Sequence, residues 1–133
     1  MTGKIERVEG AELNLDEVLM LYRCSGLADR RPVGDRARFA AMVGAANLVV
    51  TCREDERLIG IARCVSDFSY VTYLSDLAVA RDRQRLGIGR DLIAAVQQEA
   101  PQAKVVLLSA PAAVDYYPHI GFSRHDSAWV LAP

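Results

Sequence analysis

The stretch YLSDLAVARDRQRLGIGRDLIAAVQQE, residues 73–99, organises this chain as a strand, a glycine-containing turn and a helix. The strand is indicated by apolar side chains at alternate positions, the period of a half-buried sheet, at Val71, Tyr73, Leu77 and Val79. The helix is indicated by apolar residues at the three-to-four spacing of one helical face, Ile88, Leu92, Ile93 and Val96. Pro101 lies beyond its end.

The turn between them predicts an anion site. Gly87 and Gly89 let the backbone approach a ligand without an intervening Cβ, and we expect Gly89 to adopt a glycine conformation. The free N–H groups of a helix's first turn point at such a ligand, and the helix dipole favours negative charge there. Four arginines crowd the turn, Arg81, Arg83, Arg85 and Arg90. The turn is therefore predicted to bind a phosphate.

Two common phosphate motifs do not fit this turn. A P-loop ends in Gly-Lys-Ser/Thr, whereas Gly89 is followed by Arg90 and Asp91. A dinucleotide fingerprint needs a third Gly or Ala, and this chain has Leu92 there. Tight packing alone can also explain a Gly-x-Gly before a helix.

Length and composition bound the function. The 133 residues give room for one domain, residues 1–133, and with 51% hydrophobic and 25% charged residues the chain has a globular composition. A net charge of −1 gives no reason to expect nucleic acid or an anionic membrane surface as partner. No apolar run approaches the ~20 residues of a membrane span, and no signal-peptide pattern opens the chain.

The cysteines indicate the compartment. Cys24, Cys52 and Cys64 are odd in number and unpaired in spacing, so we expect reduced, mostly buried thiols in a cytoplasmic protein. No Cys or His pair has metal-ligand spacing, so no metal is expected.

Patterning along the chain predicts the order β-α-α-β-β-β-α-β-α-β, a mixed α/β fold around one sheet. Caps mark two early helices: Asn14 begins the first and Gly26 ends it, while Asp35 begins the second and Gly44 ends it. Strands are also predicted at 4–8, 48–52, 58–65, from residue 70 and at 105–108. The strand at 105–108 is a continuous apolar run, so we expect it to be covered on both faces. A helix is predicted at 110–117, followed by closing strands from 122 in which Trp129 is packed. The link 27–34 is either a solvated loop or the wall of a substrate cleft.

Two motifs in the right order carry a family resemblance. Gln84-x-x-Gly87-x-Gly89 resembles the acyl-CoA pyrophosphate signature of the GNAT superfamily of N-acyltransferases, Gln/Arg-x-x-Gly-x-Gly/Ala. The later segment from Ala113 through Tyr117 to Gly121 and Phe122 resembles the family's Ala-x-x-x-Tyr-x-x-x-Gly-Phe signature. The resemblance covers nearly the whole chain. It departs from the family at Ala110, where an Asn is frequent, and at Pro118.

The resemblance implies a GNAT-like mixed, mostly antiparallel sheet with a splayed parallel central strand pair, flanked by helices. It implies acetyl-CoA as co-substrate, with the pantetheine arm paired to the backbone of Leu77, Ala78 and Val79. It places the pyrophosphate at the turn, on Gln84, Arg85, Leu86, Gly87, Ile88, Gly89 and Arg90. A backbone N–H near Leu77 would steady the developing oxyanion.

Two residues are the catalytic candidates. Tyr117 matches the family position for a general acid on the CoA thiolate, while the adjacent Tyr116 is assigned to packing. Asp76 either accepts a proton from the amine or is a hydrogen-bonded structural carboxylate where the strands part. His119 and His125 match no family catalytic position and are assigned to the surface or to packing.

The resulting prediction is an N-acetyltransferase that moves the acetyl group of acetyl-CoA directly to a primary amine on a small molecule, peptide or protein. No Cys or Ser shows a nucleophile–base arrangement, which disfavours a covalent acyl-enzyme. The alternative is a non-catalytic acyl-CoA sensor of the same fold, for which Tyr117 would be unnecessary. The chain is expected to be a monomer or homodimer.

Overall fold

The computed structural model describes residues 3–133, whose strands form one five-stranded sheet of order β1-β2-β3-β4-β5. The strands are β1 (Lys4–Val8), β2 (Leu48–Glu54), β3 (Arg57–Ser66), β4 (Val71–Val79) and β5 (Lys104–Val106). The pairs β1–β2, β2–β3 and β3–β4 are antiparallel, and β4–β5 is parallel. The prediction of a mixed, mostly antiparallel sheet with one parallel pair is confirmed. The pair was expected at the centre of the sheet, but it lies at the edge, because no strand in residues 3–133 follows β5.

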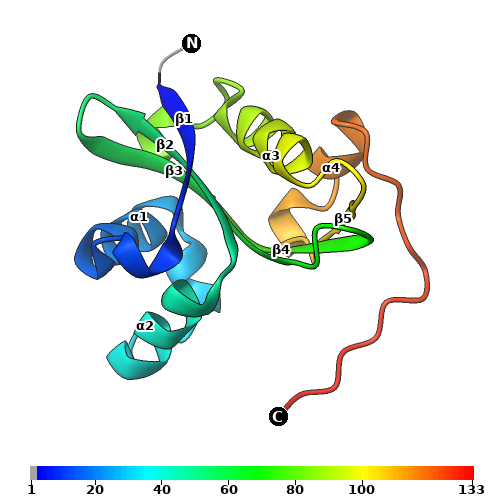
Figure 1. The fold of residues 1–133 in the computed structure, drawn as a ribbon, viewed down its shortest axis with the longest axis horizontal. Coiled ribbons are helices and arrows are strands. Elements are labelled where there is room, and N and C mark those ends of the chain that lie inside the picture. The colour runs from blue at the N-terminus through cyan, green and yellow to red at the C-terminus, as the bar shows by residue number, and fades with distance from the viewer. Residues whose placement is uncertain (1–2) are drawn as a thin grey trace.

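Helices cover both faces of this sheet. They are α1 (Leu15–Ser25), α2 (Arg36–Ala45), α3 (Ile88–Glu99) and α4 (Tyr116–His119), with short 3₁₀ helices η1 (Gly10–Glu12), η2 (Leu27–Arg30), η3 (Arg81–Arg83) and η4 (Pro111–Ala113). Figure 1 shows α1 and α2 on one side of the sheet and α3 on the other. The buried apolar side chains of these layers form one core.

Local capping explains the helix boundaries. The Asn14 side chain accepts a hydrogen bond from the Glu17 amide, and Gly26 ends α1 with φ 91°, both as predicted. The Asp35 side chain accepts from the Arg38 amide and begins α2, which ends at Ala45, one residue beyond the predicted Gly44. These short-range signals need no tertiary contact to act.

Gly60 lets α3 approach the sheet closely. A Cβ at Gly60 would lie 3.1 Å from side-chain carbons of both Ile88 and Leu92. The β2–β3 register also shifts next to this position, between Cys52 and Arg53. Gly60 therefore lies beside a register shift in the sheet and permits the close approach of α3.

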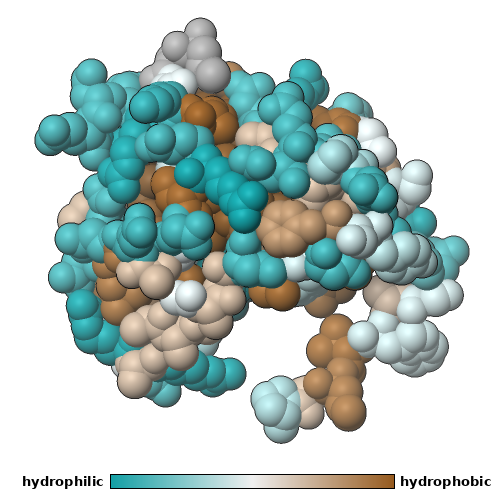
Figure 2. All heavy atoms as spheres, in the orientation of Figure 1, coloured by the Kyte–Doolittle hydropathy of each residue, from teal (hydrophilic) through white to brown (hydrophobic). Residues whose placement is uncertain are grey.

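The C-terminal part departs from the sequence prediction. Within residues 3–133 no strand follows β5, so the closing strands from residue 122 are wrong, and Trp129 is 92% exposed rather than packed. The predicted helix at 110–117 is instead divided between η4 and α4. The strand at 105–108 was expected to be covered on both faces, but β5 has only three residues, and Val106 and Leu108 are exposed. The C-terminal segment lies apart from the sheet in Figure 1, and Figure 2 shows its apolar side chains standing clear of the body.

Candidate active site

The turn before α3 has the geometry of an anion cradle. Gly87 precedes the helix with φ 85°, and Arg85 has φ 65°, so the chain bends through two left-handed positions. The first bond into α3 runs from the Asp91 N–H to the Gly87 carbonyl at 3.0 Å. The N–H groups of Ile88, Gly89 and Arg90 therefore have no partner from the helix itself.

Gly89 matters to this turn because it has no side chain, and not because of its backbone conformation. Positive φ occurs at Gly87 and not at Gly89, so the expected glycine conformation at Gly89 is wrong. A Cβ at Gly89 would lie 3.3 Å from the Tyr116 hydroxyl and 3.8 Å from Leu77 Cδ2. A side chain at this position would thus fill the gap between the first turn of α3, β4 and α4.

β4 offers an unpaired backbone edge beside this turn. It pairs with β5 only over three residues, Val71, Thr72 and Tyr73. Beyond Tyr73, Leu77, Ala78 and Val79 still pair with β3 on one side, but in residues 3–133 no strand pairs with their other side. The strands therefore splay where the family resemblance leads us to expect the pantetheine arm, and a peptide-like arm can use such an edge.

Gln84 ties the turn to the end of β4. Its Nε2 donates a hydrogen bond of 3.0 Å to the Val79 carbonyl. This contact explains why an amide side chain suits this position: it joins the strand that carries the free edge to the turn that carries the free amides.

The arginines of the turn differ in their availability. Arg83 is committed to Glu54, with 2.7 Å between Nη2 and Oε1. The side chains of Arg85 and Arg90 make no ion pair or hydrogen bond with any residue from 3 to 133. Their charges are thus available to a phosphate, whereas that of Arg83 is compensated.

A cavity of about 110 Å³ opens where β4 and the segment after β5 part. Apolar side chains form most of its wall, with two arginines, one serine and one tyrosine: Leu27, Arg30, Arg31, Leu74, Ser75, Leu77, Leu107, Leu108, Ala110, Ala113 and Tyr117. Leu27, Arg30 and Arg31 thus form part of a wall, which favours the cleft alternative for the link 27–34. The cavity brings Tyr117 and Leu77, 40 positions apart in the sequence, to one place.

Tyr117 is held in this wall by aromatic contacts. Its ring packs edge-to-face on Tyr116 and Phe122, with centroids 5.2 and 5.3 Å apart. Burial raises the pKa of the Tyr117 phenol above its ordinary value, and the neighbouring Tyr116 adds to the shift. The phenol therefore keeps its proton at neutral pH.

Asp76 is enclosed by donors on the α1 side of β4. Its carboxylate accepts hydrogen bonds from the Tyr22 hydroxyl at 2.6 Å, Arg31 Nε at 2.5 Å and Arg63 Nε at 2.5 Å. Burial alone would raise the Asp76 pKa, but the hydrogen bonds and charge of Arg63, with the bonds from Tyr22 and Arg31, outweigh it and lower the pKa. These surroundings favour the structural alternative for Asp76 over the proton acceptor.

The sequence analysis missed the partners of Asp76. Arg63 lies in the middle of an apolar strand, and its Nη1 and Nη2 donate to the Met42 carbonyl and to Ser75 Oγ. An arginine inside one apolar strand and an aspartate inside the next were a usable signal, because buried charges occur in pairs. Tyr22 carried no such signal, since it also fits the apolar face of α1.

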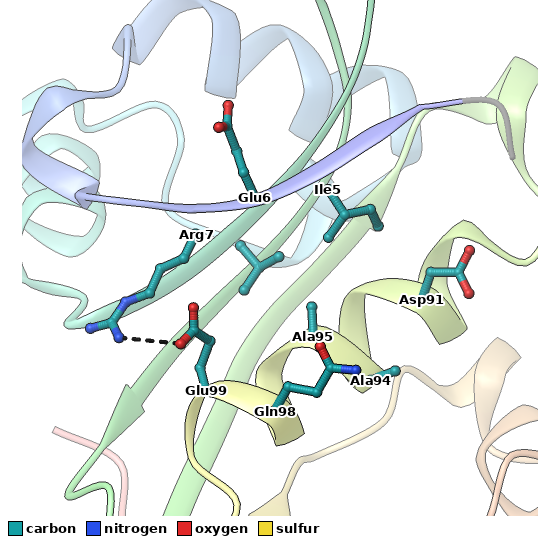
Figure 3. Close-up of a pocket in the computed structure, with 9 residues that line it drawn as sticks. Ile5, Glu6, Arg7, Asp91, Ala94, Ala95, Gln98 and Glu99 are labelled. Atoms are coloured by element: carbon teal, nitrogen blue, oxygen red, sulfur yellow. Dashed lines mark ion pairs between the residues drawn. The ribbon is translucent and has the colours of Figure 1, made fainter.

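A larger groove, of about 560 Å³, lies between β1 and α3 and contains none of the predicted site residues. Figure 3 shows Arg7 and Glu99 pointing toward one another across it, with 3.7 Å between the guanidinium and carboxylate. We assign this groove no part in the site.

The other candidates lie outside the site. His119 and His125 are exposed and line neither cavity, as the surface assignment predicted. Cys52 and Cys64 are buried and Cys24 is half-buried, all with free thiols.

In the part of the chain that the structure describes, no cluster of His, Cys, Asp or Glu could hold a metal ion. Likewise, none of the helices in residues 3–133 has the length and apolar character to cross a membrane.

A family model described as the acetyltransferase (GNAT) domain matches residues 33–130. The match spans more than half of the chain, so the chain belongs to the GNAT family of acetyltransferases and is an acyl-CoA-dependent N-acetyltransferase. No match was found among curated proteins.

Solved structures agree with this fold. The GNAT family acetyltransferase SP0256 from Streptococcus pneumoniae TIGR4 shares 21% identity, with TM-score 0.74 over 98% of this chain and 99% of that one. The aminoglycoside N-acetyltransferase AAC(6')-Iy, solved with CoA, shares 16% identity, with TM-score 0.74 over 98% and 94%. The aminoglycoside acetyltransferase meta-AAC0020, from an uncultured soil metagenomic sample, was solved with trehalose and shares 20% identity, with TM-score 0.70 over 99% and 95%. At these identities the likeness establishes the fold.

Proposed function

We propose that this chain transfers the acetyl group of acetyl-CoA directly to a primary amine, with Tyr117 as the general acid that protonates the departing thiolate. The observation that carries the proposal is the cavity that Tyr117 and Leu77 share, at the point where the strands part. Tyr117 thus lines the same cavity as Leu77, where the free edge of β4 begins.

The residues present fit acetyl-CoA. The free edge at Leu77, Ala78 and Val79 would hold the pantetheine amides, and the amides of Ile88, Gly89 and Arg90 would hold the pyrophosphate. The gap that a Cβ at Gly89 would fill supports this placement. When bound, acetyl-CoA supplies the activated acetyl group and a thiol leaving group.

The proton balance suits Tyr117. A CoA-type thiol titrates near pH 8.5 by analogy with cysteine, and a phenol near pH 10, so proton transfer from phenol to thiolate is uphill by about 2 kcal/mol. Burial of Tyr117 increases this cost but keeps the acid protonated throughout the neutral range. Tyr117 would be reprotonated by the proton that the acceptor nitrogen loses after its bond to the acetyl carbon has formed.

The amine must lose a proton before it attacks. An alkyl amine of pKa near 10.4 costs about 4–5 kcal/mol to deprotonate at pH 7. Asp76 is a poor acceptor for that proton, because its oxygens are engaged by Tyr22, Arg31 and Arg63. Positive charge beside the cavity would instead lower the amine's pKa, so that solvent could take the proton.

The test is a screen of primary amines that follows free thiol release from acetyl-CoA. Small-molecule amines, peptide N-termini and lysine-containing peptides are separate arms, and mass spectrometry identifies each product. We expect acceptor-dependent thiol release with one acetyl group added to nitrogen. Calorimetric binding of acetyl-CoA without acetylation of any amine would contradict transfer and favour the acyl-CoA sensor.

A further inference from the structure

The cavity beside Tyr117 carries an excess of positive charge. Two guanidinium groups, of Arg31 and Arg63, share the one carboxylate of Asp76. Neither arginine forms an ion pair with another carboxylate of residues 3–133, and Tyr22, the fourth member of the cluster, is a neutral donor. The cluster of Tyr22, Arg31, Arg63 and Asp76 therefore carries one net positive charge, and its member Arg31 lines the cavity.

Arg30 adds a second positive charge, and this one is available to a ligand. Arg31 is fixed in the wall, since its Nε, Nη1 and Nη2 donate to Asp76, the Arg30 carbonyl and the Ser75 carbonyl. The Arg30 side chain is exposed, lines the same cavity, and has no ion pair or hydrogen bond in the described part of the chain. A guanidinium with free N–H groups is suited to bind a carboxylate through two parallel hydrogen bonds.

The acidic residues nearby lie outside the cavity wall. Among residues 3–133, none of the side chains that line the cavity carries a carboxylate. Asp29 lies on η2 next to Arg30, but it is exposed and does not line the cavity.

From these charges we infer that the acceptor is an amine that also carries a carboxylate, which Arg30 binds, and that polycationic amines are excluded. The inference rests on the proposed acetyl transfer and names its substrate class. It separates this chain from the aminoglycoside acetyltransferases that share its fold, because aminoglycosides carry several ammonium groups and would meet two positive charges here. The cavity, at about 110 Å³, admits only the reacting end of the acceptor, so the carboxylate lies toward Arg30 and the solvent.

Matched acceptors test the inference. Glycine, L-leucine and L-phenylalanine are each compared with the corresponding carboxamide, and kanamycin serves as the polycation. Each carboxamide has the less basic amine, so a preference for the acid cannot come from easier deprotonation. We expect kcat/KM for thiol release to favour the acid by about tenfold or more in at least one pair, with kanamycin inactive.

A charge-reversed variant tests whether Arg30 causes the preference for the acid over the carboxamide. Arg30→Glu should abolish or invert the ratio of acid to amide while leaving acetyl-CoA affinity unchanged. Arg38→Glu is the matched control, because Arg38 is also exposed, lies on α2, and is absent from the cavity wall. This control should keep the wild-type ratio within about twofold.

Binding to the CoA-loaded protein gives a readout that does not require turnover. Calorimetry should show the acids binding more tightly than the amides, and Arg30→Glu should remove this difference. Preferential binding of the acids without any turnover would support the anion site and contradict acetyl transfer. Turnover without a preference for the acid in any pair, efficient acetylation of kanamycin, or an unchanged ratio in Arg30→Glu would overturn the specificity and leave acetyl transfer standing. Absence of both binding and turnover for all three acids would also overturn the specificity.

Discussion

Arg31 and Asp76 form an ion pair, with 2.5 Å between Nε and Oδ1, although they lie 45 positions apart in the chain. This ion pair links the segment after α1 to the middle of β4. Because Arg31 lines the cavity and Asp76 lies behind it, the contact determines where that wall stands relative to the free edge of β4. Asp76 thus has a positioning role in the account we propose.

Asp76→Asn should destabilise the fold strongly. It leaves the buried guanidinium of Arg63 and that of Arg31 without their carboxylate, a change that typically costs about 3–5 kcal/mol. Urea unfolding at pH 7 measures the loss. Asp16→Asn is the control, since its pair with Arg36 is exposed and should cost under about 1 kcal/mol. Similar losses in both variants would show that the buried cluster does not stabilise the fold.

The same cluster predicts a pH dependence of stability. The Asp76 pKa is lowered in the folded protein: burial opposes the shift, but the hydrogen bonds and charge of Arg63 prevail. A carboxylate with a depressed pKa stabilises the fold fully above its unfolded value of about 3.9, and this contribution disappears as the pH falls through the folded pKa. The difference in unfolding free energy between wild type and Asp76→Asn should therefore stay constant from about pH 7 to 5 and shrink below about pH 4. A difference that already shrinks between pH 7 and 5 would indicate a raised Asp76 pKa.

Gly89→Val should abolish acetyl-CoA binding. The added side chain would fill the gap between Leu77 and the Tyr116 hydroxyl, next to the free amides of the first turn of α3. Calorimetry on the folded variant measures the effect. Gly44→Val is the matched control, because a Cβ at Gly44 on α2 has no neighbour within 4 Å. Wild-type affinity in Gly89→Val would exclude this turn as the binding site.

Arg85→Ala should weaken CoA binding by about 1–3 kcal/mol, because the unpaired guanidinium is available to a phosphate. Dephospho-CoA, which lacks the 3′-phosphate, shows which phosphate is bound: an equal loss with both ligands assigns Arg85 to the pyrophosphate. Arg38→Ala provides the comparison for a distant exposed arginine. If Arg85→Ala and Arg38→Ala bind alike, the charge of Arg85 is merely solvated.

The features that could be predicted from sequence are those with local causes. Asn14, Gly26 and Asp35 mark helix ends through bonds to residues at most four positions away, and they were correctly assigned. The turn before α3 was recognisable because Gly87 and the arginines are contiguous. Even there, the left-handed position could not be assigned between Gly87 and Gly89, since both permit it.

The features that could not be predicted depend on distant neighbours. A strand forms only where another strand lies beside it, and no local pattern shows that residues 122–133 lack such a neighbour. The cluster of Tyr22, Arg31, Arg63 and Asp76 joins four separate elements or links, so its geometry emerges only from the complete fold. For the same reason, Arg30 could not be distinguished from other surface arginines in the sequence.

The central claim is that Tyr117 donates a proton to the departing thiolate, and Tyr117→Phe tests it most directly. The substitution keeps the ring against Tyr116 and Phe122 and removes only the hydroxyl. At saturating acetyl-CoA, with the preferred amine, we predict that kcat falls by about 10²–10⁴-fold while acetyl-CoA affinity stays nearly unchanged. Tyr116→Phe is the control and should keep kcat within a few-fold of wild type. Full activity in Tyr117→Phe would contradict the account.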